Sequence, residues 1–168
     1  MAKIDEIYMS EALREAQKAG LEDEVPVGCV VVHDRKIIAR AHNQVERLKD
    51  PTAHAEMIAI TQSANYLGSK WLNEASIYVT IEPCSMCAGA LVLSRIKRLI
   101  YGADDLKAGA CGSVMNISNN NRLNHRIKVK KGILGKECGS LLSDYFKKKR
   151  SRAKNSGEMA EWPKAAHC

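Results

Sequence analysis

Two short segments of the chain carry residues that together could bind a metal ion and move protons. The first contains His54 and Glu56, and the second contains Cys84 and Cys87 directly after Pro83. One imidazole and two thiolates suit zinc, and three protein ligands leave the fourth tetrahedral position to a water molecule. Zinc lowers the pKa of such a water towards neutrality. Because Glu56 is not needed as a ligand, it can serve as a general acid and base, and the pattern predicts hydrolytic chemistry with one Zn²⁺ per chain.

A Cys-x-x-Cys pair also occurs in structural zinc sites and in redox-active sites. A structural site needs a fourth protein ligand, and no further Cys or His pair at the usual spacing supplies one. A thioredoxin-like redox site has no use for a His-x-Glu segment upstream. A catalytic zinc site is therefore the favoured interpretation, with a structural site and a redox pair as the alternatives.

The segments that position these residues alternate between helical and strand patterns. Apolar residues at helical spacing predict a helix over 4–19 that ends at Gly20, and two apolar runs around a turn at 33–36 predict a hairpin of strands within 25–32 and over 37–41. Further predicted elements are a helix from about 54 to 65, a strand over 76–81, a helix over 84–93, strands over 98–101 and 127–131, and a helix from 136 to about 150, with a loop over 104–126. Helices between strands indicate a layered α/β sandwich.

This order of elements predicts how the motif residues meet. Cys84 and Cys87 are three residues apart and share one face of a short helix. His54 and Glu56 lie in the first turn of another helix. Two helix N-termini that meet at one ion place backbone N–H groups and the positive ends of two helix dipoles beside an anionic intermediate.

Length and composition predict one globular domain. The 168 residues are 45% apolar and 27% charged, which is ordinary for a soluble protein with a real core. No run of about 18 apolar residues predicts a membrane span, and the N-terminus lacks the apolar region of a secretory signal. Six cysteines, two of them in the metal motif, indicate a reducing compartment, so we expect a cytoplasmic location.

Positive charge is concentrated near the C-terminus. The net charge of +7 favours a polyanionic partner, and the basic strip Lys147–Lys154 carries six positive residues in eight. Such a strip can bind nucleic-acid phosphates, and the alternative is a solubilising or disordered tail. We expect a zinc-dependent catalytic domain over 1–150 and a basic, disordered tail over 151–168.

A resemblance to a known family extends from about Met9 to about Lys148. The segments that carry it are 24–28, 50–56, 82–90, 94–96, 101–103, 107–113, 124–126 and 132–134. In these segments the chain resembles the bacterial tRNA-specific adenosine deaminases of the cytidine-deaminase-like superfamily. The zinc core alone would fit many deaminases, whereas the segments after Gly102 and the Tyr145–Lys147 ending are typical of the tRNA enzymes.

The resemblance implies a three-layer α/β/α sandwich with a central mixed five-stranded sheet. It implies an RNA-editing hydrolase that converts adenosine to inosine at the wobble position of a tRNA anticodon. In that reaction a zinc hydroxide attacks C6 of the flipped adenine, and Glu56 is the proton shuttle. The ligands would be His54, Cys84 and Cys87. The partners implied are a tRNA anticodon stem-loop and a second copy of the chain.

The resemblance also implies a set of substrate-binding residues. Asn43 would contact the flipped nucleoside, and aromatic residues at 145–146 would stack on loop bases, as is common for single-stranded RNA. The alternatives are a turn role for Asn43, a solvated loop around 105–107, and core packing for one of the two aromatic residues, with the other free. The full predicted set is Asn43, Ala55, Asp105, Lys107, Tyr145 and Phe146.

Two other functions stay open at this point. A free-base or nucleoside deaminase acting on guanine or cytosine would share the zinc core and would need neither a basic strip nor an exposed aromatic pair. A zinc-stabilised RNA-binding module without turnover would have no use for Glu56.

Overall fold

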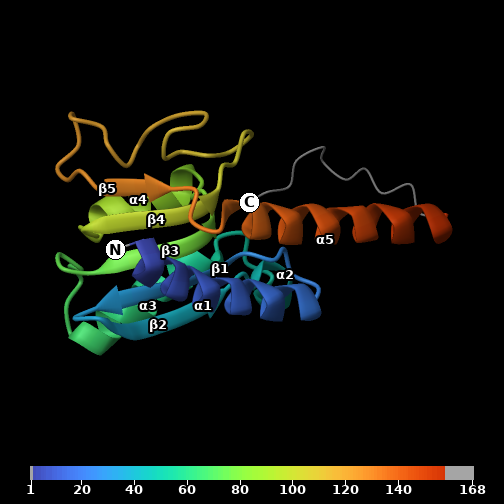
Figure 1. Ribbon diagram of the computed structural model, residues 1–168, viewed down its shortest axis with the longest axis horizontal. Coiled ribbons are helices and arrows are strands. Elements are labelled where there is room, and N and C mark those ends of the chain that lie inside the picture. Colours follow the sequence, from blue (N-terminus) through green and yellow to red (C-terminus); the bar gives the residue numbers. More distant parts are fainter. Residues whose placement is uncertain (1, 158–168) are drawn as a thin grey trace.

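The computed structural model describes residues 2–157, and in it a mixed sheet lies between two layers of helices (Figure 1). The strand order is β2-β1-β3-β4-β5, in which β1 pairs antiparallel with β2 and β3, while β3, β4 and β5 run parallel. The strands are β1 (Gly28–His33), β2 (Lys36–His42), β3 (Ser76–Ile81), β4 (Arg98–Ala103) and β5 (Lys128–Lys131). The helices are α1 (Ala2–Leu21), α2 (Val45–Leu48), α3 (Ala55–Leu67), α4 (Ser85–Leu93) and α5 (Gly135–Asn155).

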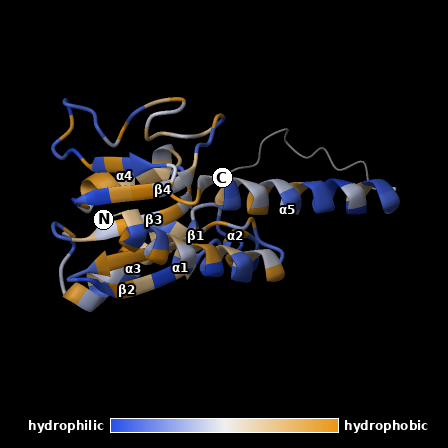
Figure 2. Cartoon of the chain, in the orientation of Figure 1, coloured by the Kyte–Doolittle hydropathy of each residue, from blue (hydrophilic) through white to orange (hydrophobic). Residues whose placement is uncertain are grey.

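Alternating side chains along the strands build one core on each face of the sheet. Cys29 and Val31 of β1 pack in the cluster that includes residues of α3 and α4, whereas Val30 packs in the cluster that includes residues of α1 and α5. Hydrophobic residues accordingly follow the central strands, and hydrophilic ones cover the outer end of α5 (Figure 2). The predicted three-layer α/β/α sandwich with a mixed five-stranded sheet is confirmed.

Helix α1 is held closely against the sheet at two places along its length. At Gly28 a Cβ atom would overlap the Ala12 carbonyl, so the absence of a side chain lets α1 pack directly on β1. In the first turn of α1, the buried Asp5 carboxylate accepts hydrogen bonds from the Tyr78 hydroxyl at 2.8 Å and from Lys130 Nζ at 2.6 Å. Burial would raise the pKa of Asp5, but these partners and Arg98 hold it below its ordinary value.

The structure differs from the predicted elements in two places. The short helix α2 was not predicted. Helix α5 ends at Asn155 rather than near residue 150, so residues 151–155 of the predicted tail are helical. The last part of that tail, 158–168, lies outside the described residues, and a domain boundary at residue 150 stays a prediction. Within residues 2–157, no helix combines the length and the apolar composition needed to cross a membrane.

Candidate metal centre and substrate pocket

The three predicted ligands come together because two helices begin at the same place. His54 is the N-cap residue of α3, and Cys84 is the N-cap residue of α4, with Cys87 in the first turn of α4. Neither N-cap side chain forms a capping hydrogen bond, so both can point at a shared ligand. The predicted meeting of two helix N-termini is therefore present in the structure.

The distances between the three ligand atoms fit a zinc ion. His54 Nδ1 lies 3.6 Å from Cys84 Sγ and 3.5 Å from Cys87 Sγ. Tetrahedral zinc with Zn–S bonds of about 2.3 Å and Zn–N bonds of about 2.0–2.1 Å separates sulfur from nitrogen by about 3.6 Å. All three residues are buried, and no other His, Cys, Asp or Glu cluster of this kind occurs within residues 2–157. Three ligands fit a catalytic site better than a closed structural one.

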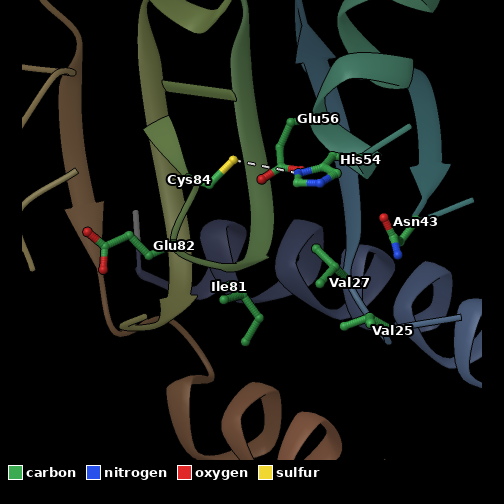
Figure 3. Close-up of a pocket in the computed structure, with 8 residues that line it drawn as sticks. All are labelled: Val25, Val27, Asn43, His54, Glu56, Ile81, Glu82 and Cys84. Carbon is green, nitrogen blue, oxygen red and sulfur yellow. Dashed lines mark hydrogen bonds between the residues drawn. The ribbon is translucent and has the colours of Figure 1, made fainter. Parts of the chain in front are cut away.

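Glu56 lies beside this cluster in the first turn of α3. Figure 3 shows its carboxylate directed towards His54 and Cys84. Burial raises the pKa of Glu56 to about 7, and the charge of His54 acts in the opposite direction. A carboxyl group with a pKa near neutrality can both accept and donate a proton, which is what a proton shuttle needs.

A small pocket opens onto the cluster. Its volume is about 350 Å³, part of it open to solvent. The lining combines an apolar wall with a few polar groups, which is typical of sites that hold a flat ring in a fixed orientation. The lining residues are Val25, Val27, Asn43, His54, Glu56, Ile81, Glu82 and Cys84.

Of the two predicted substrate-binding residues nearest the metal-ligand cluster, Asn43 lines the pocket and Ala55 lies in the core. Asn43 lines the pocket, and its backbone N–H donates to the Val27 carbonyl at 3.0 Å, which holds it at the end of β2. Ala55 is fully buried, and its side chain packs in the core on the α3 and α4 face. A substrate contact by Ala55 would therefore have to come from its backbone, and that contact stays a prediction.

The loop residues Asp105 and Lys107 play different structural parts. Asp105 is buried, and its Oδ1 accepts the backbone N–H groups of Lys107 at 3.0 Å and Ala108 at 3.1 Å. This pattern favours a role in shaping the loop rather than the solvated position that was the alternative for it. Lys107 is exposed at the tip of the same turn.

Tyr145 and Phe146 were expected to differ, with one packed and the other free. Instead both are half-buried and meet edge to face, with ring centroids 5.4 Å apart. The Tyr145 hydroxyl donates to the Asp23 carbonyl at 3.0 Å, which ties α5 to the end of α1. Stacking of either ring on RNA stays a prediction.

Two buried glutamates near the pocket were not singled out from the sequence. Glu24 accepts the backbone N–H groups of Glu46 at 3.1 Å and Arg47 at 2.6 Å, and so caps α2 just after Asn43. Glu82 accepts hydrogen bonds from the loop after β4. One signal was available: each acidic residue stands beside an apolar run, where a carboxylate is buried only if several donors surround it.

Comparisons of the sequence with known proteins identify deaminases as relatives of this chain. The model of the MafB19-like deaminase family matches residues 4–150. The tRNA-specific adenosine deaminase of Bacillus subtilis (strain 168) is 48% identical over 158 residues, which is 92% of this chain and 98% of that protein. The enzyme of the same name from Aquifex aeolicus (strain VF5) is 50% identical over 146 residues, 87% of this chain and 96% of that protein.

Solved structures similar to this chain are also those of deaminases. A structure from studies of A-to-I editing by tRNA:A34 deaminases at the wobble position of transfer RNA is 43% identical, with a TM-score of 0.78 over 80% of this chain and 98% of that chain. A guanine deaminase from Bacillus subtilis is less similar, with 35% identity and a TM-score of 0.58 over 64% of this chain and 69% of that chain.

Proposed function

Because this chain belongs to the deaminase family and, within it, to the tRNA-specific adenosine deaminases, we propose that it converts adenosine to inosine at the wobble position of a tRNA anticodon. It is an enzyme that deaminates adenosine. The observation that carries the proposed mechanism is the buried cluster of His54, Cys84 and Cys87 with Glu56 beside it, at a small pocket that opens to solvent.

The chemistry is divided between the metal and Glu56. His54, Cys84 and Cys87 would hold one zinc ion, which when bound would act as a Lewis acid and lower the pKa of a water molecule towards neutrality. Glu56 takes a proton from the attacking water and delivers it to N1 of the adenine. It then takes the second proton of that water from the hydroxyl group now on C6 and passes it to the amine, so that the C6–N bond breaks, ammonia leaves and the C6 carbonyl of inosine forms. The direction of the pKa shift of Glu56 supports these successive transfers.

The pocket supports an extruded base. C6 of an adenine stacked within RNA cannot reach a buried metal centre, so the nucleotide must turn out of its stack. Val27 and Ile81 offer an apolar wall for the ring. The Asn43 side chain can both donate and accept hydrogen bonds, so it can orient the nucleoside. The homodimer implied by the resemblance and the cytoplasmic location expected from the cysteine content stay predictions.

The direct test offers the enzyme several substrates in parallel. An anticodon stem-loop with a wobble adenosine is incubated with zinc-loaded protein, alongside free adenosine, cytidine and guanine. We expect inosine and ammonia from the stem-loop alone. Ammonia from free guanine or cytidine would instead support a free-base or nucleoside deaminase, and RNA binding without ammonia would support a binding module.

Helix α5 is the proposed phosphate-binding surface. Its C-terminal half extends beyond the sheet (Figure 1), and Lys147, Lys148 and Arg150 are exposed there. Lys149 differs, because it lies 2.6 Å from Asp23 Oδ2 and contributes to holding α5 in place. Binding of phosphates by the exposed residues would supply affinity that falls as salt rises.

Neutralising part of this surface should therefore change the salt dependence of binding. In Lys147→Gln/Lys148→Gln, the plot of log affinity against log salt should flatten by roughly 0.7–0.9 for each phosphate that the protein no longer neutralises. Fluorescence anisotropy of a labelled stem-loop measures this slope. The matched control is Arg35→Gln/Lys36→Gln, which removes two exposed charges at the turn between β1 and β2 and should leave the slope unchanged. Equal slopes in the wild type and in both variants would show that Lys147 and Lys148 of α5 do not bind RNA phosphates.

A further inference from the structure

Glu82 joins the metal centre to the loop that follows β4. It stands directly after β3 and two residues before the ligand Cys84. Its carboxylate is buried, with 3% of the residue exposed. Oε1 accepts the backbone N–H groups of Cys111 and Ser113, each at 3.0 Å. Oε2 accepts the N–H of Asp105 at 3.0 Å and the Ser113 hydroxyl.

The hydrogen bonds that the Glu82 carboxylate accepts come from the loop after β4 rather than from a basic side chain. Among the described residues, no Lys, Arg or His forms an ion pair with Glu82. A buried charge without a counter-ion persists only where hydrogen-bond donors replace its hydration, and here one loop supplies all the donors named above. The position of that loop is therefore tied to the position of Glu82.

The fit between the loop and Glu82 is close on every side. At Gly109 a Cβ atom would overlap Glu82 Oε2, so only glycine lets the loop pass over the carboxylate. The Ala110 N–H donates to the Pro83 carbonyl at 2.9 Å, and Cys84 forms a β-bridge with Gly109. The loop after β4 is thus hydrogen-bonded to Pro83 and Cys84, the segment that leads into α4.

The same hydrogen bonds also hold an exposed turn, residues 105–108, in place. Asp105, whose N–H is held by Glu82, accepts the N–H groups of Lys107 and Ala108 through its own side chain. This turn presents Leu106, which is 80% exposed, and the exposed Lys107 to solvent. One carboxylate therefore fixes both the approach to Cys84 and the outward turn.

We propose that Glu82 is a positioning residue for the deamination of RNA: it sets the turn at 105–108 against the metal centre, so that the turn meets the RNA strand whose base enters the pocket. This inference rests on the proposed function. Glu82 does not touch the reacting atoms, because its carboxylate points away from Glu56 and His54 (Figure 3). Its effect is on how well the RNA is held, since a turn ordered in advance loses less entropy on binding.

The test replaces Glu82 with Gln in the zinc-loaded enzyme. A glutamine NH₂ group would face backbone N–H donors, so part of the hydrogen bonding is removed at nearly constant volume. We expect KM for the stem-loop to rise at least ~10-fold, because unsatisfied buried donors destabilise the ordered turn, while kcat changes by less than ~3-fold. Zinc should stay at one per chain. Hydrogen exchange should become faster at the amides of Asp105, Cys111 and Ser113.

Two further variants separate positioning from general stability. Asp5→Asn also removes a buried carboxylate, but its partners Tyr78 and Lys130 do not line the pocket, so it should lower Tm and leave KM unchanged. Ser113→Ala removes one donor to Glu82 and should raise KM by ~2- to 10-fold, the range for one hydrogen bond. If Glu82→Gln fails to fold, Ser113→Ala decides by the same readouts.

The outcomes that overturn the inference are distinct from failure of the proposed function. An unchanged KM, a fall in kcat alone, or loss of zinc in Glu82→Gln would each show that Glu82 does not act by positioning the turn. A wild-type enzyme that leaves the stem-loop unreacted would refute the proposed function instead. In that case unchanged hydrogen exchange in Glu82→Gln would still refute the structural link between Glu82 and the loop.

Discussion

Replacing Glu56 with Ala should leave the protein folded and zinc-loaded while stem-loop turnover falls by at least ~10²-fold, the usual scale for a general acid–base group. The loss can be far larger, because one carboxylate serves several proton transfers. No neighbouring group that lines the pocket can substitute for it. Of the other titratable residues there, His54 and Cys84 belong to the ligand cluster, and Glu82 is occupied by loop donors.

Single-turnover rates at saturating stem-loop, together with zinc content, check this prediction. Glu56→Gln is the companion variant, since it keeps the volume of the side chain and removes its ability to accept the proton of a water molecule. Both variants should bind the stem-loop with nearly unchanged affinity. A rate close to wild type would show that another base does the work, and loss of zinc would show that Glu56 holds the metal.

The sequence predicted the elements and the grouping of His54, Cys84 and Cys87 well, because both depend on local spacing. Alternating apolar residues such as Ile77, Val79 and Ile81 identify β3, since side chains of a strand alternate between faces. The side chains of Cys84 and Cys87 are confined to one helix turn by their separation of three residues. The position of His54 at the start of α3 followed from the polar and proline residues before it.

The interactions around the pocket could not be predicted, because they join residues far apart in sequence. Glu82 meets Ser113 across 31 positions, and Glu24 meets Arg47 across 23. A carboxylate that caps a distant backbone leaves no periodic pattern. The same holds for Tyr145, whose aromatic character suggested RNA stacking but whose hydroxyl bonds the backbone of Asp23.

The length of α5 could have been predicted from propensity. The basic charge of residues 147–154 suggested a tail, but Lys, Arg and Ala are good helix formers, and no glycine or proline interrupts the segment before Gly157. Gly157 has a φ of 68°, the left-handed conformation that often follows a helix C-terminus. The charge pattern therefore identified residues 147–154 as a basic surface, whereas helix propensity determines that the helix continues to Asn155.

Replacing Cys87 with Ala should remove zinc and activity together. Cys87 is fully buried in the first turn of α4, and its Sγ lies 3.5 Å from His54 Nδ1. The variant leaves His54 and Cys84 as a two-ligand site, whereas catalytic zinc is held by three protein ligands. We expect the purified variant to contain far less than one zinc per chain and to release no inosine from the stem-loop.

The matched control is Cys138→Ala, which removes another buried thiol. Cys138 packs in the core between the sheet and the layer of α1 and α5, and it lies outside the ligand cluster. This variant should keep one zinc per chain and its activity, although the poorer packing should lower Tm. Metal analysis by mass spectrometry, with the stem-loop assay on the same preparations, compares the two variants. Full zinc occupancy in Cys87→Ala would show that the ligand set is wrong. Full occupancy with normal turnover would show that neither zinc binding nor the chemistry depends on Cys87.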